Sequence, residues 1–444
     1  MKPMNTTETA TTPLGKWACK DASFLVLCFL VGLLAGTAAF ILKRLTAFIS
    51  HIVTSGLTPE QIPWRFLWLP VAGIILAGLF QRYIVRRPLD HVTDRINNAL
   101  RSRNYYLPQS TVFSPIIGAS LTLGFGGSAG LEGPVAYASS AIGSSVGRFF
   151  HVPYQMVGVL VAIGGAAGIA GIFKSPMGGL FFALEVLLVQ ASAKNVVRLA
   201  VACITAGMTA FALSGFTHDI ELRTIPDFNP QLLLWAVPVG IVCGFYSAYY
   251  SGLMAHITAL FHKIRHPFAK WIIAGCSISV MVFSLPSLFG EGYQVVADIL
   301  NGTGADALTF GSIMGKIKGM SPIIMLLIIT AMVALLKSPA SAATNDGGGV
   351  AGDFAPTIFA GAIVGFFLAT VATTVLGFNV SVPAMVFMAM GGVMAGAVRA
   401  PLMAMFIVAE STGAYSLFLP LAITSAISFV IVWVLTLRTG RNAR

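Results

Sequence analysis

The chain carries little charge for its length. Only 10% of its 444 residues are charged, with 16 acids against 27 lysines and arginines. Soluble globular domains carry roughly 25% charged residues, whereas this chain is 56% hydrophobic. The composition excludes a soluble globular protein and predicts an all-α polytopic membrane protein.

The cysteines and histidines do not follow the spacings that are typical of disulfide-rich or metal-binding proteins. The five cysteines show no CxxC spacing, and the seven histidines lack an HExxH or similar spacing. Four of the cysteines lie in or beside apolar runs, where they pack as small hydrophobic residues. The sequence therefore predicts no disulfide, no metal site and no cofactor. No cleavable signal peptide is apparent, since the first apolar run begins near Ser23 after a polar tail.

Basic residues gather at the ends of the chain and between its apolar runs. Cytoplasmic loops of membrane proteins are enriched in lysine and arginine, so this pattern indicates membrane topology rather than nucleic-acid binding. We expect both termini in the cytoplasm and the protein in the cell (inner) membrane. The basic residues include Lys16, Lys20, Lys43, Arg44, Arg82, Arg86, Arg87, Lys263, Arg265, Lys270, Arg438 and Arg441.

Several of the apolar runs are interrupted by glycine or proline. At membrane depth a broken helix is tolerated only where its backbone is buried in protein or lines a cavity. This favours a transporter or channel over a simple anchor. The runs are residues 23–42, 66–81, 112–147, 155–190, 196–215, 231–261, 271–289, 322–336, 357–377, 380–412 and 417–437.

One carboxylate stands out in the glycine-rich segment 126–134, which reads GGSAGLEGP. An ionisable side chain at membrane depth costs several kcal/mol unless it faces a partner or a watery cavity, so Glu132 is a candidate functional residue. The glycines interrupt a regular helix, and Pro134 suits the first turn of a new one. Because a helix N-terminus binds anions, this carboxylate could occupy a place that a permeant anion or a proton contests.

The chain also contains an internal repeat. Segment 130–134 matches 352–356, and a second pattern of a glycine, a base, a proline and a carboxylate recurs at one constant separation. The matched positions of the second pattern are Gly171, Lys174, Pro176 and Glu185 with Gly396, Arg399, Pro401 and Glu410.

The repeat divides the chain into two halves, residues 22–215 and 231–437, within a transmembrane domain 22–437. A polar cytoplasmic tail, 1–21, precedes this domain and a basic cytoplasmic tail, 438–444, follows it. The connection 216–230 is acidic and looks external, whereas a basic tail precedes the first half. The two halves therefore begin on opposite sides of the membrane. This predicts two inverted repeats of broken and tilted helices that converge near the membrane midplane.

These motifs resemble those of the CLC family of chloride channels and chloride/proton antiporters, over residues 22–437. Segment 130–134 is similar to the family motif GxEGP, and 352–356 to GxFxP. The resemblance implies that Glu132 is the external gate and that the backbone N–H groups of Asp353 and Phe354 face the anion. It also implies that Gly130 and Gly133 line the anion site, and that Tyr415 donates its hydroxyl. The family further implies a homodimer with one pore per subunit, bound in lipid, and the chain leaves no room for the cytoplasmic regulatory (CBS) domains that many relatives carry.

Two departures from the family bear on selectivity and coupling. Where the first anion motif, GSGIP, should fall, residues 90–94 read DHVTD, so the usual serine is missing and His91 or Thr93 could replace it. Thr93 or Asp90 could also cap a short helix there. Fluoride-exporting relatives vary at this motif as well. The position that matches the internal proton-transfer glutamate is Val186, directly after Glu185, which resembles the channel branch.

The leading hypothesis is therefore a passive chloride channel, gated by voltage or pH, for chloride or a similar monovalent anion. The alternative is a chloride/proton antiporter, and a remote alternative is a cation-coupled solute transporter. The protein is not expected to be an enzyme. An intramembrane protease using Ser128 would need a histidine or lysine base within an adjacent apolar helix, and the histidines lie in or near polar segments.

Individual residues also have structural interpretations. Glu132 could be a structural carboxylate at a helix N-terminus, and Tyr415 a tyrosine of the membrane interface. Glu185 and Glu410 are predicted to be structural and to pair with Lys174 and Arg399. The side chain of Asp353 should point away from the anion or stay protonated, since its charge would repel the substrate.

Overall fold

Long apolar runs in the sequence become long helices. The computed structural model describes residues 21–55, 62–89, 91–220, 222–223, 226–312 and 319–438, and every regular element in these ranges is a helix. The predicted tails 1–21 and 438–444 lie almost wholly outside these ranges, as do Cys19 and Asp90.

The first half contains α2 (Asp21–Thr54), α3 (Ile62–Arg65), α4 (Leu69–Leu79), η2 (Phe80–Val85), α5 (Val92–Arg101), η3 (Gln109–Val112), α6 (Ser114–Gly124), α7 (Glu132–Phe149), α8 (Tyr154–Phe173), α9 (Pro176–Phe181), η4 (Phe182–Val186) and α10 (Ala193–Leu213). The second half contains α11 (Gln231–His262), α12 (Pro267–Ser284), η5 (Pro286–Leu288), α13 (Tyr293–Leu300), α14 (Gly304–Thr309), α15 (Pro322–Asp346), α16 (Phe354–Thr370), η7 (Val371–Val375), α17 (Val382–Val398), α18 (Pro401–Thr412), η8 (Tyr415–Leu417) and α19 (Phe418–Arg438).

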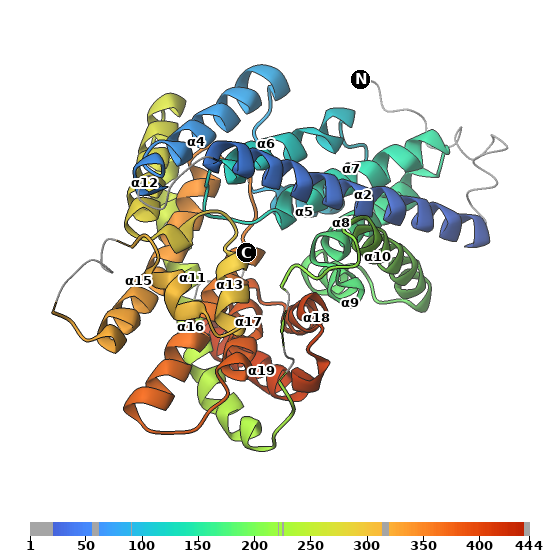
Figure 1. Cartoon of the computed structure of the whole chain (residues 1–444). Coiled ribbons are helices and arrows are strands. Elements are labelled where there is room, and N and C mark those ends of the chain that lie inside the picture. The colour runs from blue at the N-terminus through green and yellow to red at the C-terminus, as the bar shows by residue number, and fades with distance from the viewer. Residues whose placement is uncertain are drawn as a thin grey trace.

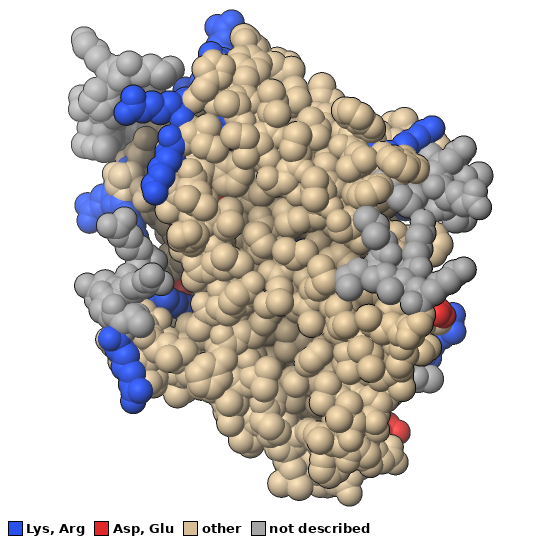
Figure 2. Space-filling view, turned by 90° about the vertical axis from the view of Figure 1, so that its left-hand side faces the viewer, with Lys and Arg blue, Asp and Glu red and all other residues tan. Residues whose placement is uncertain are grey.

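Eight of the described helices are long and apolar enough to cross a membrane. Figure 2 shows the corresponding surface, a broad uncharged band between two margins at which Lys, Arg, Asp and Glu side chains gather. The prediction of an all-α, multi-pass membrane protein is confirmed.

Two of the predicted interruptions fall between helices, whereas the run 231–261 forms one continuous helix, α11, with Pro238 inside it. The run 155–190 is broken after α8, where Lys174 adopts a left-handed conformation with φ of 52°. The run 380–412 is broken at the matching residue, Arg399, with φ of 62°. In each half a proline then begins the next helix, which is α9 or α18, because proline suits the first helical position.

Close packing of small residues holds each half together. The helix pair α7 and α8 approaches so closely that a Cβ on Gly143 would lie 2.0 Å from the backbone oxygen of Leu160. The equivalent pair, α16 and α17, leaves only 2.5 Å between a Cβ on Gly361 and the oxygen of Ala389. Figure 1 shows the first pair near α2 and α10, and the second pair beside α19.

The helices run between two ends of the molecule. We call the end that carries Arg82, Arg86, Arg87, Lys263, Arg265 and Lys270 the basic face. At the start of α2, Asp21 pairs with Lys194 and Arg198 of α10, and α19 ends at the basic residue Arg438. The other end, with Asp219, Pro226 and Glu291, is called the opposite face. There Ser416, just before α19, donates a hydrogen bond to the oxygen of Pro226 over 2.8 Å.

Candidate functional site

The two glycine-rich motifs meet in the middle of the molecule. The N–H group of Gly130 donates to the oxygen of Gly352 over 2.9 Å, and the N–H group of Gly352 donates back to the oxygen of Gly130 over 2.8 Å. This isolated antiparallel bridge joins the backbone just before α7 to the backbone just before α16. Two segments from different halves therefore form one site.

The side chain of Glu132 occupies the N-terminus of α16. Its Oε1 accepts hydrogen bonds from the N–H group of Phe354 and, over 3.0 Å, from that of Ala355. Glu132 is 1% exposed, and its Oε2 has no partner among the other described residues. The first N–H groups of a helix have no partner within the helix and favour an anion, so the carboxylate fills an anion site.

Glycine is required on both sides of this carboxylate. A Cβ on Gly130 would lie 2.1 Å from Oε2 of Glu132, and a Cβ on Gly352 would lie 2.7 Å from Oε1. Gly133 faces Val92 and the Cα of Gly352, which brings the start of α5 against the start of α7. Of the two predicted backbone donors, Phe354 reaches Glu132, while its second donor is Ala355, which the sequence analysis missed.

Asp353 directs its carboxyl group toward α15. Its Oδ1 accepts hydrogen bonds from the side-chain amide of Asn345 and, over 3.4 Å, from the hydroxyl of Ser341. This carboxyl group is thereby held by neutral donors, while Glu132 takes the N–H groups of α16.

His91 precedes α5 in a left-handed conformation, with φ of 45°. Its Nε2 lies 2.8 Å from Oδ1 of Asp346, and the side chain of Asp346 is only 3% exposed. Since α5 begins at Val92, the expectation that Thr93 caps it is wrong, because Thr93 lies within the helix. An anion-binding role for His91 or Thr93 stays a prediction.

The structure does not bring Tyr415 to the carboxylate of Glu132. The tyrosine is 53% exposed, faces Glu410, and precedes Ser416, which is bound to Pro226 at the opposite face. A different tyrosine lies nearer the site: Tyr250 of α11 is 1% exposed, and its hydroxyl is next to Ser341 and within electrostatic range of Asp353 and Glu132. A tyrosine in the middle of an apolar run was the signal available in the sequence.

A buried lysine was also missed. Lys337 lies inside α15 with 0% exposure, and its Nζ donates to the hydroxyl of Ser128 over 3.0 Å. The ammonium group also lies 4.6 Å from the ring centroid of Phe359 and 3.4 Å from the oxygen of Gly290. A lysine directly after the apolar run 322–336 and before a further stretch of small residues was the signal that could have identified it. Its charge acts on the carboxylates of Glu132 and Glu291.

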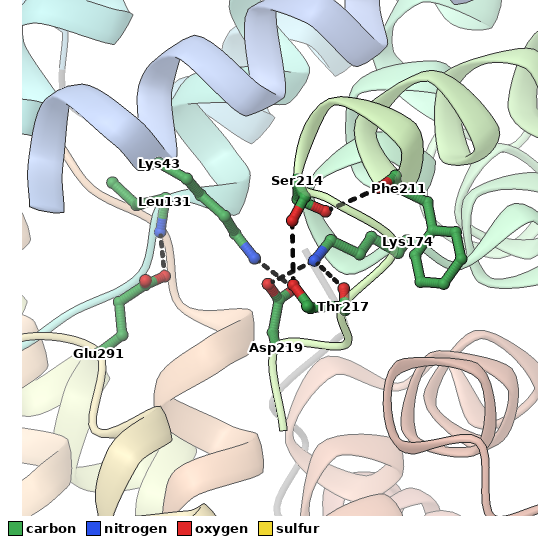
Figure 3. Close-up of polar contacts among 8 residues, drawn as sticks. All are labelled: Lys43, Leu131, Lys174, Phe211, Ser214, Thr217, Asp219 and Glu291. Atoms are coloured by element: carbon green, nitrogen blue, oxygen red, sulfur yellow. Dashed lines mark hydrogen bonds and ion pairs between the residues drawn. The ribbon is translucent and has the colours of Figure 1, made fainter. Parts of the chain in front are cut away.

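A cavity of about 590 Å³ opens at the opposite face. Its lining includes Leu131, Lys43, Asp219 and Glu291, so it reaches the residue next to Glu132. Glu291 accepts a hydrogen bond from the N–H group of Leu131 over 3.3 Å, as Figure 3 shows. Burial raises the pKa of Glu291 to about 7, although Lys43 and the Leu131 N–H group favour its ionised form.

Asp219 also lines this cavity and binds two lysines. Lys43 and Lys174, from α2 and the end of α8, both point at its carboxylate, over 2.5 and 3.0 Å (Figure 3). Burial by itself would raise the pKa of Asp219, but the two ammonium groups outweigh it and hold the pKa below its usual value. The predicted partner of Glu185, Lys174, thus binds an acid of the connection between the halves.

A second cavity, of about 360 Å³, opens at the basic face. It is lined by Arg82, Arg86, Arg87 and Lys270 and reaches Asn345 and Asp346. Asn345 is the residue that holds Asp353, directly before the N–H groups that bind Glu132. The two cavities therefore approach the junction of α7 and α16 from opposite faces.

Glu185 and Glu410 bind backbone N–H groups across the junction of α9 and α18. Glu185 accepts from Leu402 and Met403 over 3.2 and 2.9 Å, whereas Glu410 accepts from Met177 and Gly178 over 3.0 and 3.2 Å. Glu185 of η4 thus caps α18, and Glu410 of α18 caps α9, which η4 continues. Val186 follows Glu185 at the end of η4.

Helices that begin at membrane depth, with N–H groups converging on one carboxylate between two cavities, define a multi-pass anion-transport protein. A sequence profile described as "Voltage gated chloride channel" matches residues 72–432. The chain belongs to this family, the CLC family, whose members are channels and transporters.

Named relatives and solved structures extend the comparison. The voltage-gated ClC-type chloride channel ClcB of Salmonella typhimurium is 26% identical over 425 residues, covering 92% of this chain and 95% of that protein. The H(+)/Cl(−) exchange transporter ClcA of Vibrio vulnificus is 25% identical over 422 residues, covering 91% and 85%.

Two crystal structures share the fold. A slow cyanobacterial Cl−/H+ antiporter superimposes with a TM-score of 0.72 at 22% identity, covering 94% of this chain and 98% of that one. A CLC-type fluoride/proton antiporter also gives a TM-score of 0.72, at 21% identity, covering 96% of each chain.

Proposed function

We propose that the protein exchanges a small monovalent anion, with chloride the first candidate, for protons, and that Glu132 is the exchange group. In this mechanism the ionised carboxylate of Glu132 closes the path by occupying the N-terminus of α16. When the carboxylate takes up a proton, it releases the N–H groups of Phe354 and Ala355, which then bind the anion. Loss of the proton returns the carboxylate to the N–H groups and displaces the anion.

The observation that carries this proposal is the pair of hydrogen bonds from Phe354 and Ala355 to Glu132. Neutral N–H donors replace the water around an anion without binding it too tightly to leave. The same donors cannot hold a carboxylate and an anion at once. Competition for these two N–H groups therefore links the position of the anion to the protonation of Glu132.

Exchange is favoured here over the passive conduction that Val186 suggests. Among the relatives, ClcA is named an exchange transporter, and both superimposed crystal structures are described as antiporters. ClcB is named a channel, so a chloride channel is the second candidate. The argument from Val186 concerns one position, whereas competition at Glu132 requires no carboxylate there.

Other groups near the carboxylate support a path for an anion. Lys337 attracts an anion toward Ser128 from the side of the larger cavity, and the hydroxyl of Tyr250 is a candidate donor on the other side. The neutral donors on Asp353 reduce the repulsion that its charge would exert. Fluoride is a second candidate substrate, because one neighbour in structure transports it.

The distribution of basic residues gives the proposed orientation of the protein in the membrane. Since basic loops face the cytoplasm, the basic face would be internal, with both termini in the cytoplasm, and the cavity beside Glu291 would be external. A homodimer with one pore in each subunit, set in the cell (inner) membrane, is the assembly that the family resemblance implies.

The test is a coupled flux measurement in proteoliposomes. A chloride gradient should drive protons uphill in the wild-type protein, and Glu132→Gln should abolish proton movement while chloride continues to cross. The conservative control is Asp298→Asn, which changes an acid on α13 that bonds to Gln294. Chloride flux without proton movement in the wild-type protein would establish the channel instead, and fluoride measured in parallel would identify the preferred anion.

A further inference from the structure

Three side chains that are far apart in the sequence converge at the basic face. His91 precedes α5, His262 ends α11 and Asp346 ends α15, and one potential ligand atom from each lies within 4.8 Å of the others. No sequence spacing could reveal this cluster, because each residue belongs to a different element. We propose that His91, His262 and Asp346 bind a zinc ion, and that the bound ion slows anion transport.

The donor set suits zinc. Two imidazole nitrogens and one carboxylate oxygen are three common zinc ligands, and a fourth position then remains open to water or an anion. Zinc holds such atoms at about 2.0–2.2 Å, so the ligand atoms must draw together to roughly 3.3 Å from one another. The side chain of His262 is exposed and can rotate to achieve this, and its ring already lies nearly parallel to that of His91, at 16°.

The carboxylate of the cluster is already positioned. Asp346 is held at Oδ1 by His91, over 2.8 Å, and at Oδ2 by the hydroxyl of Thr258, over 2.5 Å. Thr258 lies one turn before His262 on α11, so it fixes the carboxylate beside that histidine. Hydrogen-bonded groups of this kind orient metal ligands and raise metal affinity.

The charges around the cluster favour a cation with an anion as its fourth ligand. Asp353 is within electrostatic range of His91, Asp346 and Asp94, so it adds negative charge beside the cluster. On the other side, Arg82, Arg86 and Lys270 line the cavity that reaches Asp346, and they favour an anion at the open position.

A metal ion at this place would act on the transport path. It would join α5 of the first half to α11 and α15 of the second half. Asp346 is next to Asn345, which binds Asp353 at the start of α16. Holding these elements together restrains the N-terminus of α16, where the anion is proposed to bind, so zinc should reduce the rate from the basic face. This effect on rate rests on the proposed transport function, whereas zinc binding does not.

The first experiment measures binding without transport. Calorimetric titration of the detergent-solubilised protein with zinc chloride should give one ion per chain, and the affinity should fall at least tenfold in His262→Ala. His266→Ala is the matched control and should bind zinc normally, since it removes another exposed histidine, four positions later and directly before α12. Equal zinc affinity in wild-type protein and His262→Ala would overturn the site, as would an equal loss in His266→Ala.

The second experiment measures anion flux in proteoliposomes with zinc added to one side at a time. Zinc at the basic face should slow the wild-type protein at least tenfold, and a chelator should restore the rate. His262→Ala should resist zinc, and His262→Gln gives a second variant should the alanine variant be unstable. Binding without inhibition would overturn the effect on transport but keep the site. Absence of anion flux before zinc is added would count against the proposed function alone.

Discussion

The two halves of the chain are joined at two places that differ in symmetry. At the junction of α9 and α18 both halves contribute the same device, a carboxylate that caps the facing helix. At the junction of α7 and α16 the backbone bridge is equally reciprocal, but the side chains are not. There Glu132 has Phe354 as its counterpart, so one half supplies the carboxylate and the other supplies the N–H groups that bind it.

This difference suggests that the junction of α9 and α18 serves stability, whereas the junction of α7 and α16 serves transport. A reciprocal pair of caps leaves each carboxylate satisfied and gives neither a reason to move. The unmatched pair leaves a single carboxylate on N–H groups that an anion can also use. We therefore expect substitutions at the symmetric junction to reduce stability, and substitutions at the asymmetric junction to change transport.

The largest effect should follow from Glu132→Gln. A neutral amide cannot carry a proton through the cycle and binds the N–H groups of Phe354 and Ala355 more weakly than a carboxylate does. Proton movement driven by a chloride gradient should fall at least a hundredfold, or about 2.7 kcal/mol in activation free energy, as measured with a pH electrode in proteoliposomes. Melting temperature should change little, and a variant that still pumped protons would show that the asymmetry has no functional meaning.

The next effect is on stability, at the symmetric junction. Glu410→Ala removes the acceptor of two N–H groups and of the hydroxyl of Ser175, which lies 2.5 Å away. Hydrogen bonds to a charged group contribute roughly 1.5–3 kcal/mol each, so the two N–H bonds alone predict a loss of at least about 3 kcal/mol. The hydroxyl of Ser175 can still donate to the oxygen of Phe406. Glu185→Ala, which frees two N–H groups, should cost less. Thermal unfolding in detergent measures the loss in both variants. An unchanged melting temperature together with lost proton coupling would show that this junction serves transport rather than stability.

A smaller effect should appear as a pH dependence at the opposite face. Because burial raises the pKa of Glu291 from 4.5 to about 7, the folded protein holds this proton more strongly than the unfolded chain. The resulting stability is fully present below about pH 4.5 and is lost as the pH rises through about 7. Its slope is at most about 1.4 kcal/mol per pH unit.

The variant that tests this is Glu291→Gln. Its melting temperature should vary less than that of the wild-type protein between pH 4.5 and pH 7. Parallel curves for the two proteins would mean that Glu291 titrates normally in the folded state.

The smallest effect concerns Asp219, which joins the connection between the halves to Lys43 of α2 and Lys174 at the end of α8. Lys43 and Lys174 hold its pKa below 3.8, so its stabilising contribution is present above that pH and disappears as the pH falls further. Partly exposed ion pairs contribute little, and Asp219→Asn should cost about 1 kcal/mol at neutral pH. Thermal melting at pH 7 and pH 3 measures this contribution, which should be smaller at the lower pH. Loss of proton coupling in Asp219→Asn would show that Asp219 takes part in transport.

The sequence predicts most of the fold, because apolar runs, glycine breaks and helix-starting prolines are local signals. It also predicts Glu132 and the start of α16, since an isolated carboxylate and a repeat can be read directly. The second N–H donor, Ala355, depends on how the carboxylate meets the helix, which no residue type reveals. Tyr250, within an apolar run, and Lys337, directly after one, could have been noticed as polar residues in apolar surroundings.

Other features depend on long-range packing. The cluster of His91, His262 and Asp346 joins elements from different halves, and spacing along the chain carries no trace of it. The prediction that Glu185 and Glu410 pair with bases failed to anticipate N–H partners across the junction. Their structural role stays a prediction, drawn from the repeat that places the two carboxylates at matching positions in the two halves.

The contact between Lys337 and Ser128 bears on how the chain is made. A lysine in the middle of a helix opposes insertion from the translocon into lipid by roughly 3 kcal/mol. Its hydroxyl partner is 209 positions earlier, so it has already left the ribosome when α15 emerges. The first half can therefore receive the ammonium group during synthesis, and the second half produced alone should insert α15 poorly.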